Sequence, residues 1–407
     1  MAARAERFLV VSAVAGLVAI ALVFAPGLEI FRSGKEALMR LQAIVSAFAL
    51  AMAVAYGGTE RLRELFRDRA VAAVLAGSVV WTAITTLTSG HRLLSVDSLV
   101  TVVCSAMLFV AVWYVARAIP VAALLVLVPG VLINTALATL QEYAIWNPFH
   151  VSVVEVQHLE ATALLGNPND VGGYLALCAI VLFAAAEVLH GRLRWIAAAG
   201  CAVAIAGVFV SQTRTAVLAI AATAVFLAAR RSYKAVLVSA AVIVLALLVA
   251  TQVELPALTR LTKIPSEIAK GNWNVVLSDR LPAFAAAAGM FREHPLFGVG
   301  PGAYKFFYLP YRIRMTGIYP EAVMRGAGVN FAETHNDHLQ LLAETGLPGY
   351  ALFVAACVIL ARRDRWLGLP LVIMVAVLAL AFFPLQIAAT RHLLITVSAL
   401  LIGWRRT

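Results

Sequence analysis

Residues 170–189 have the sequence DVGGYLALCAIVLFAAAEVL, an apolar run long enough to span the hydrocarbon core of a bilayer as one helix. The rest of the chain has the same character. Of its 407 residues, 62% are hydrophobic and 13% are charged, whereas roughly 25% are charged in an ordinary soluble domain. Because a water-soluble core cannot absorb that much apolar surface, the sequence predicts an integral membrane protein.

Twelve apolar runs of this kind follow one another along the chain. Inside a bilayer the backbone must satisfy its own hydrogen bonds, so each run is expected to be a helix. The predicted spans are residues 8–25, 41–56, 70–89, 96–115, 119–138, 170–189, 194–211, 214–230, 234–251, 347–362, 368–384 and 387–403. The first run is about one bilayer long, so we interpret it as a retained helix and not as a signal peptide. The expected fold is a single all-α polytopic membrane domain covering residues 1–407.

The distribution of Lys and Arg predicts the orientation. If the N-terminus is cytoplasmic, 17 of the 32 Lys and Arg residues fall in cytoplasmic segments, and nine more fall in the outer segment 252–346. Long translocated segments are exempt from the positive-inside rule, which leaves six for all the short outer loops. These clusters explain the net charge of +11 without a nucleic-acid partner. We expect a multi-pass protein of the bacterial inner (cytoplasmic) membrane, with both ends in the cytoplasm.

Two outer segments, 139–169 and 252–346, are too long to be simple turns. Loops longer than about 15 residues are usually functional or disordered. The second segment, between the ninth and tenth spans, contains many aromatic residues interleaved with Arg and Lys, which argues against disorder. We expect it to be helical, to lie on the periplasmic side and to carry catalytic residues.

The first candidate for chemistry is Arg214, in the sequence VSQTRT at 210–215. It lies at the outer junction of two apolar spans that are joined almost without a loop. An arginine at that depth costs a few kcal/mol unless it is paired or hydrated. A snorkelling arginine is the structural alternative, but four consecutive polar residues are not needed for snorkelling. We therefore predict a functional role for Arg214.

The second candidate is Arg280, in the sequence SDRLP at 278–282, before an alanine-rich stretch. Ser278 or Asp279 is expected to cap a helix, and Pro282 is tolerated in its first turn. Arg280 would then lie beside free backbone N–H groups at the positive end of the helix dipole, where anions bind. A surface Asp–Arg pair is the structural alternative. The helix should end near 294–295.

The third candidate is His335, in the sequence ETHNDHL at 333–339. Thr334 with Asp337 resembles a capping box, which would place His335 at the first helical position. The positive helix end disfavours imidazolium, so the ring should stay neutral, as a general base requires. A helix-capping histidine is the structural alternative. His338, one turn along, is expected to be the more structural of the two histidines.

Several other sites are disfavoured by the sequence. Gly298, Gly300 and Gly302 predict a tight turn, but they follow no strand and open no long helix, so they do not indicate a dinucleotide site. The four cysteines lie in apolar runs without CxxC spacing. The two nearby histidines lack a third ligand at suitable spacing, and there is no Asp-x-Asp. We expect neither a metal nor another cofactor.

Three motifs together resemble the signature of the O-antigen ligase family. The first is His335-Asn336, nine residues, Gly346, two residues and Gly349; Gly346 before Pro348 is also a helix stop signal. The others are GNPN at 166–169 and SQTR at 211–214. The resemblance covers about residues 160–362. Members of this family are integral-membrane glycosyltransferases related to the O-antigen polymerases.

This resemblance implies a GT-C-like helical fold and a glycosyltransferase of lipopolysaccharide biosynthesis. The donor would be O-antigen on undecaprenyl diphosphate, and the acceptor would be lipid A–core oligosaccharide. The catalytic residues would be Arg214, His335 and, in a more variable loop, Arg280. The substrate-binding residues would be Arg214, Arg280, Asn336, Gln212, Asn167, Asn169 and His338.

The residue types suit this chemistry. A lipid diphosphate gains negative charge as the glycosidic bond breaks, and two arginines can bind its oxygens in place of a metal. A neutral histidine can accept the proton of the acceptor hydroxyl. A single displacement of this kind inverts the anomeric centre. We expect a monomer whose other partners are membrane lipids.

Three alternatives remain open at this point. A lipid-linked glycan transporter or flippase predicts ionisable residues near mid-membrane, whereas the predicted spans have almost no charge at their centres. An O-antigen polymerase would share the long outer segment and the arginines. A protein O-glycosyltransferase of the same superfamily also fits, although no added C-terminal soluble domain is evident.

Overall fold

The computed structural model describes residues 1–25, 31–149, 161–232, 264–315 and 330–404, together with Lys234 and Ile318. These residues form helices and connecting turns, without a strand among them. The N-terminal helices are α1 (Ala2–Leu22), α2 (Ser33–Gly57), α3 (Glu60–Arg67), α4 (Arg69–Thr88) and α5 (Arg92–Val115). The 3-10 turns η1 (Ala116–Ala118) and η2 (Val121–Val126) lead to α6 (Leu127–Glu142), α7 (Pro168–Val188), α8 (Gly191–Val210) and α9 (Arg214–Arg231).

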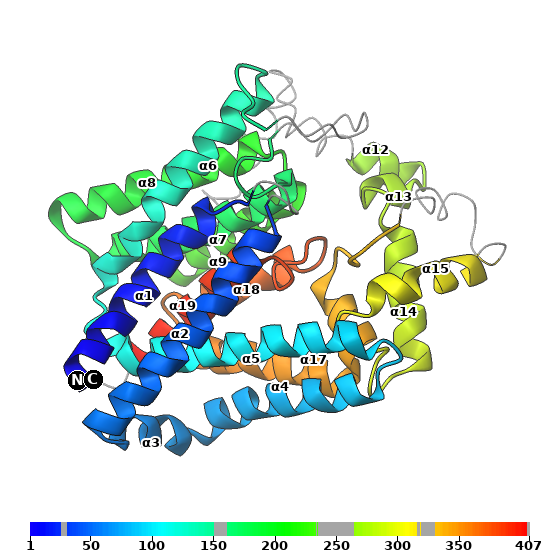
Figure 1. Ribbon diagram of the computed structural model, residues 1–407. Helices are drawn as coiled ribbons and strands as arrows, with labels where there is room; N and C mark the ends of the chain where they lie inside the picture. The colour runs from blue at the N-terminus through cyan, green and yellow to red at the C-terminus, as the bar shows by residue number, and fades with distance from the viewer. Residues whose placement is uncertain are drawn as a thin grey trace.

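The next described helices after α9 are short. They are α12 (Ile264–Ala269), α13 (Trp273–Val276), α14 (Leu281–Glu293) and α15 (Tyr304–Met315). The chain continues with α17 (Asp337–Arg363), α18 (Gly368–Leu378) and α19 (Ala388–Trp404). Figure 1 shows α12 to α15 gathered at one end of the molecule and the two chain termini side by side at the opposite end. This arrangement agrees with an even number of membrane crossings.

Within the described residues, eight helices are long and apolar enough to cross a membrane. They are α1, α2, α4, α5 extended by η1, α6 preceded by η2, α7, α8 and α17. The prediction of an all-helical membrane protein is therefore confirmed, whereas the count of twelve spans stays a prediction. The predicted span 234–251 lies, apart from Lys234, outside the described residues.

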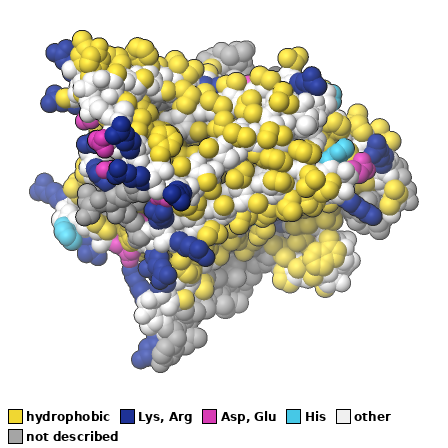
Figure 2. All heavy atoms as spheres, turned by 90° about the horizontal axis from the view of Figure 1, so that it is seen from below, with side chains coloured by type: hydrophobic (Ala, Val, Ile, Leu, Met, Phe, Trp, Pro, Cys, Tyr) yellow, Lys and Arg dark blue, Asp and Glu magenta, His cyan; other side chains and the backbone are white. Residues whose placement is uncertain are grey.

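The surface agrees with a lipid environment. In Figure 2 hydrophobic side chains cover the middle of one face, and charged side chains gather toward its two ends. Large apolar side chains such as Leu41, Phe48 and Leu87 are exposed on these helices. Apolar side chains that contact acyl chains remain outside water, so their exposure costs little in a membrane. At the end that carries the termini, Arg61 lies near Glu6, and Arg117 donates a hydrogen bond to Glu64.

The centre of the bundle is α7, whose Tyr174 is fully buried. Small residues allow its neighbours to approach closely. A Cβ atom at Gly173 would lie 2.3 Å from the Phe382 ring, and one at Gly172 would lie 2.5 Å from Thr213. These contacts bring the start of α7 against the α8–α9 junction and against the segment that follows α18.

The predicted bounds of the span 368–384 are wrong at its end, because α18 ends at Leu378. Its eleven residues rise only about 16 Å, which is less than the thickness of a hydrocarbon core. Residues 379–387 form an irregular segment, which we call the 379–387 loop, before α19 begins at Ala388. Pro384 lies within it. Such backbone is tolerated at membrane depth when protein groups satisfy it, and the groups that do so belong to the candidate site.

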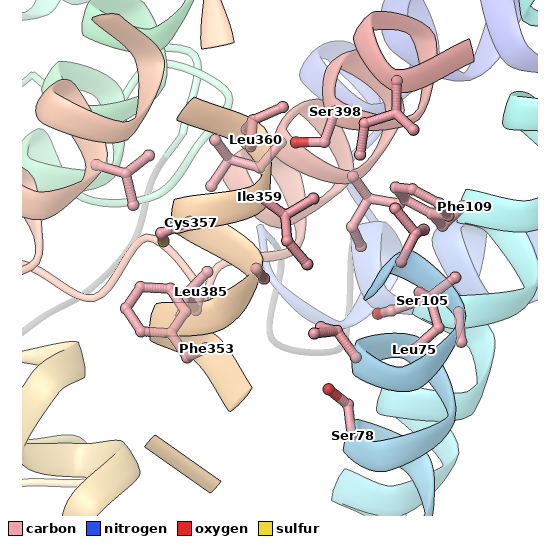
Figure 3. A pocket seen from close by; sticks show the side chains of 18 of the residues that line it. Leu75, Ser78, Ser105, Phe109, Phe353, Cys357, Ile359, Leu360, Leu385 and Ser398 are labelled. Atoms are coloured by element: carbon pink, nitrogen blue, oxygen red, sulfur yellow. The ribbon is translucent and has the colours of Figure 1, made fainter. Parts of the chain in front are cut away.

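A cavity of about 290 Å³ lies between α4, α5, α17, α18 and α19. Figure 3 shows its lining, which is apolar except for Ser78, Ser105 and Ser398. Leu385 of the 379–387 loop contributes to the lining, but the arginines and His335 of the candidate site do not. The cavity is therefore a feature of the membrane-embedded bundle, separate from the polar site.

Candidate functional site

The α8–α9 junction packs directly on the start of α7. Thr213 donates a hydrogen bond of 2.8 Å to the carbonyl of Pro168, and the side chain of Gln212 donates one to Glu142 at the end of α6. Asn167 caps α7 by accepting a hydrogen bond from the backbone N–H of Asn169. The GNPN and SQTR motifs, more than forty residues apart in the chain, therefore form one surface. Arg214 is the first residue of α9 at its edge.

Arg214 also contacts the segment that precedes α14. Its guanidinium donates a hydrogen bond to the hydroxyl of Ser278. Ser278 and Asp279 both have left-handed backbone, with φ of 55° and 59°. Neither caps α14, so that expectation was wrong. Instead the side chain of Asn274 accepts hydrogen bonds from the backbone N–H of Leu281 and holds the carboxylate of Asp279 through its amide.

Arg280 occupies the N-cap position of α14, with Pro282 in the first turn, and α14 ends at Glu293 as predicted. The pKa of Arg280 falls from 12.5 to about 10, first because burial disfavours its charge and second because Arg214 repels it. Arg280 still carries its charge near neutral pH. Two partly desolvated guanidinium groups that repel each other are stabilised by an anion bound between them.

The 379–387 loop packs against the segments that carry Arg280 and His335. Its carbonyl groups are exposed by the early end of α18, and three of them accept hydrogen bonds from the candidate site. Ala379 accepts from the backbone N–H of Asp337, Leu380 from the side chain of Asn336, and Ala381 from Arg280. In return, Asp337 accepts a 2.8 Å hydrogen bond from the N–H of Leu385. This loop was not expected from the sequence, although Pro384 was a possible signal.

His335 precedes α17 and is not its first helical residue, so the predicted position was wrong. The helix begins at Asp337, and Asn336 is its N-cap, accepting a 3.0 Å hydrogen bond from the N–H of Leu339. Thr334 bonds to the backbone of Asn336 and not to Asp337 in a capping box. His335 has left-handed backbone with φ of 55°, a conformation that costs a non-glycine residue about 1 kcal/mol.

Two aromatic rings hold the imidazole of His335. The ring centroids lie 5.7 Å from Phe331 and 4.7 Å from Phe383, both in edge-to-face arrangements. Within the described structure, Nδ1 is buried without a hydrogen-bond partner. The pKa of His335 falls from 6.5 to about 3 because of burial first, then Arg280, then Arg32. The ring is therefore neutral, as predicted, but burial and arginine charges are the cause, where the sequence suggested the helix dipole.

Arg32, just before α2, is a site residue that the sequence analysis missed. Its guanidinium donates a 3.0 Å hydrogen bond to Glu333, lies 3.6 Å from Asp170 and lies over the ring of Phe383 at 5.5 Å. It joins segments from the start, middle and end of the chain. The available signal was charge alone, because Arg32 is one of the six Lys and Arg residues expected in short outer loops.

Four of the six described non-glycine residues with left-handed backbone lie in these site segments; they are Gln212, Ser278, Asp279 and His335. Such conformations persist only where surrounding structure enforces them, and they cluster at functional sites. The strained backbone thus coincides with the segments that carry Arg214, Arg280 and His335, and it supports a functional role for this region.

Some predicted substrate-binding residues are engaged within the protein. Both ends of the Asn336 side-chain amide are used, one by Leu339 and one by Leu380. His338 points its ring nitrogens to the carbonyl of Ala376 and to the hydroxyl of Tyr350, each at 3.2 Å. These contacts agree with the expectation that His338 is the more structural histidine.

The glycines of the motif shape the scaffold behind the site. Gly346 breaks α17 with φ of 67° and ψ of −172°, and a Cβ atom there would lie 2.0 Å from the carbonyl oxygen of Leu296. The predicted turn is present, since Gly298, Gly300 and Gly302 all have positive φ. The side chain of Glu344 accepts a hydrogen bond from the N–H of Tyr304 and so ties this turn to α17.

Over the part of the chain that the structure describes, no three His, Cys, Asp or Glu side chains group as a metal site would require. Glu333, two residues before His335, and Asp170 both pair with Arg32.

A family model described as O-antigen ligase matches residues 199–354. The matched segment runs from α8 into α17 and includes Arg214, Arg280 and His335. The match confirms the resemblance for the SQTR motif and for the motif from His335 to Gly349, whereas GNPN at 166–169 lies outside the matched residues. No curated protein matches the chain.

Proposed function

We propose, from this family match and the geometry of the site, that the chain is an O-antigen ligase of the bacterial inner membrane. It would transfer O-antigen glycan from undecaprenyl diphosphate to lipid A–core oligosaccharide on the periplasmic face, with a GT-C-like fold. The observation that carries the proposal is that Arg214, Arg280 and His335, which are distant in the chain, belong to one region of the structure. Arg214 bonds to Ser278 beside Arg280, and the charge of Arg280 acts on His335.

In this mechanism Arg214 and Arg280 bind the diphosphate of the donor. Guanidinium groups bind phosphate oxygens bidentately and stabilise the negative charge that develops on the leaving group. No divalent metal is required for this step. The hydrogen bond from Arg280 to Ala381 and that from Arg214 to Ser278 orient the two groups before substrate arrives, which lowers the cost of reorganisation in the transition state.

His335 acts as the general base. The acceptor hydroxyl oxygen attacks the anomeric carbon, its proton passes to the imidazole, and the bond from that carbon to the diphosphate oxygen breaks. Undecaprenyl diphosphate leaves, and the configuration at the anomeric carbon inverts. Positioned proton transfer of this kind contributes roughly 10²–10⁴ in rate. The aromatic contacts with Phe331 and Phe383 fix the ring during the transfer.

The test is the lipopolysaccharide profile of a strain in which the gene is deleted. Under the ligase proposal, the strain loses all O-antigen on lipopolysaccharide while lipid-linked polymer accumulates, and the wild-type gene restores the ladder. A profile with a single O-antigen repeat on the core would instead identify a polymerase. A strain that accumulates no outward-facing lipid-linked polymer would indicate a flippase.

A further inference from the structure

A second polar cluster lies beside the proposed catalytic histidine and is not used by the mechanism above. It consists of Arg32, Glu333 and Asp170, and we call it the Arg32 cluster. Arg32 bonds to Glu333 at 3.0 Å and pairs with Asp170 at 3.6 Å. The three residues come from the start of α2, the segment before α17 and the first turn of α7. Tertiary structure alone brings them together.

One residue of the Arg32 cluster is buried, and the other two are accessible. The side chain of Asp170 is 1% exposed, whereas those of Arg32 and Glu333 are 40% and 22% exposed. Asp170 is thus a buried anchor for the guanidinium, and the Arg32–Glu333 pair is the part that a ligand could reach. An arginine held in place by a buried carboxylate loses little side-chain entropy when it binds a ligand.

The cluster is close to the proposed base. The guanidinium of Arg32 lies 5.5 Å from the centre of the Phe383 ring, and the imidazole of His335 lies 4.7 Å from the same centre. Glu333 is also two residues from His335 in the chain. The guanidinium of Arg32 and the imidazole of His335 therefore contact the same Phe383 ring. The distance between them is no more than these two distances added together, which one or two sugar rings can cover.

After burial, two arginines from distant parts of the chain lower the pKa of His335. Arg280 belongs to the pair that would hold the diphosphate, and Arg32 belongs to the second cluster. In an inverting displacement the attacking hydroxyl and the leaving group lie on opposite sides of the anomeric carbon, and the base must contact the attacking hydroxyl. With Arg214 and Arg280 assigned to the leaving group, the Arg32 cluster is a charged cluster within the described residues that remains available beside the base.

We propose that Arg32 and Glu333 form the subsite that binds hydroxyl groups of the acceptor sugar, an inference that rests on the proposed ligase function. A paired guanidinium and carboxylate offer donors and acceptors together, which matches a hydroxyl group that both donates and accepts. The accessible carboxylate of Glu333 would repel a phosphate or an acidic sugar at this point. The subsite therefore recognises a neutral sugar ring and positions its hydroxyl for His335.

The proposal is tested by steady-state kinetics of the full-length purified protein in lipid nanodiscs. The donor is lipid-linked O-antigen from cells in which the gene is deleted, and the acceptor is lipopolysaccharide that lacks O-antigen. Arg32→Ala should raise the KM for the acceptor about tenfold to a hundredfold, as expected for the loss of hydrogen bonds to a charged group. The KM for the donor should be unchanged, and kcat, measured at saturating acceptor, should stay close to that of the wild-type protein. Glu333→Gln should have a smaller effect in the same direction.

Three further variants separate binding from structure. Arg92→Ala removes an exposed arginine at the start of α5 and should leave both KM values unchanged. Asp170→Asn removes the anchor but keeps Arg32, and it should raise the acceptor KM less than Arg32→Ala does. Arg32→Lys keeps the charge but not the fork, and it should be intermediate. An equal effect of Asp170→Asn and Arg32→Ala would show that Arg32 only ties α2 to α7.

The same kinetics distinguish the ligase function from the acceptor subsite. If the wild-type protein forms no acceptor-linked product, the ligase function fails and the subsite falls with it. If the wild-type protein transfers glycan but Arg32→Ala changes the donor KM alone, or neither KM, the subsite is wrong and the ligase function stands. A rise in acceptor KM that high salt reproduces in the wild-type protein would indicate an acidic group on the acceptor and would overturn the neutral-hydroxyl assignment.

Discussion

Arg280 donates a hydrogen bond to the backbone carbonyl of Ala381, although 101 residues separate the two in the chain. This contact joins the segment before α14 to the 379–387 loop, whose neighbouring carbonyls hold Asn336 and Asp337. One irregular loop therefore supports both the proposed phosphate-binding arginine and the residues that follow the proposed base. The relative position of Arg280 and His335 depends on it.

The arginine pair should be indispensable for transfer. Arg214→Ala should abolish activity, and Arg214→Lys should rescue it poorly, because an ammonium group loses the bidentate geometry. Arg280→Ala should be severe for the same reason and because it also releases Ala381. Arg292→Ala, an exposed arginine on α14, is the matched control and should be active. Initial rates of purified variants are the measurement, and full activity of Arg214→Ala would remove the diphosphate role.

His335 should be required for chemistry and not for folding. Asparagine tolerates left-handed backbone better than most residues, so His335→Asn preserves the conformation at φ of 55° and removes the base. We expect kcat to fall about a hundredfold or more with donor binding nearly intact. His338→Asn loses contacts with Ala376 and Tyr350 and should lower thermal stability more than kcat. An intolerant His338 and a tolerant His335 would reverse this assignment.

The pH dependence should differ between free and donor-bound enzyme. In the free protein the pKa of His335 is about 3, because of burial and the charges of Arg280 and Arg32. The imidazole is thus unprotonated over the whole physiological range, and the acidic limb of kcat/KM for the donor should lie well below pH 6.5. A bound diphosphate offsets the arginine charges and raises this pKa, so the acidic limb of kcat should lie at higher pH. Coincident limbs in wild-type rate profiles would contradict this electrostatic account.

Gly346 should tolerate no side chain. Its φ of 67° and ψ of −172° belong to a region that is essentially restricted to glycine, and an added Cβ would meet the carbonyl oxygen of Leu296. Gly346→Ala should therefore markedly reduce thermal stability and activity. Gly271 provides the control, because its φ is also positive, at 73°, but nothing lies within 4 Å of an added Cβ. Gly271→Ala should cost only about 1–2 kcal/mol, and similar melting temperatures for the two variants would refute the clash.

Transfer should not depend on a divalent metal. The arginine pair provides the positive charge that a metal would otherwise supply to the leaving group. Activity of the purified protein should therefore persist in EDTA and be unchanged by added Mg²⁺ or Mn²⁺. A strict metal requirement would contradict the scheme and direct attention to Glu142, whose carboxylate contacts Gln212 in the SQTR motif.

Local sequence patterns were sufficient to predict most of the long helices that the structure describes and several of their ends. The run that predicted a span at 214–230 forms α9 (Arg214–Arg231), and the segment predicted to end near 294–295 forms α14 (Leu281–Glu293). Each of these helices satisfies its backbone within its own segment, so composition and length carry the information. The motifs around Arg214, Arg280 and His335 were also visible, because short recurring patterns need no knowledge of the fold.

The meeting of those motifs was decided only by tertiary structure. The early end of α18 and the 379–387 loop depend on hydrogen bonds to Arg280, Asn336 and Asp337, which are distant in the chain. The pairing of Arg32 with Glu333 spans 301 residues, and no local pattern records it. The sequence determined which segments are apolar enough to form membrane helices and which side chains are available for chemistry, because both depend on local composition. The placement of His335 among Phe331, Phe383 and arginines from two other parts of the chain required the packed bundle, because non-local contacts alone set that environment.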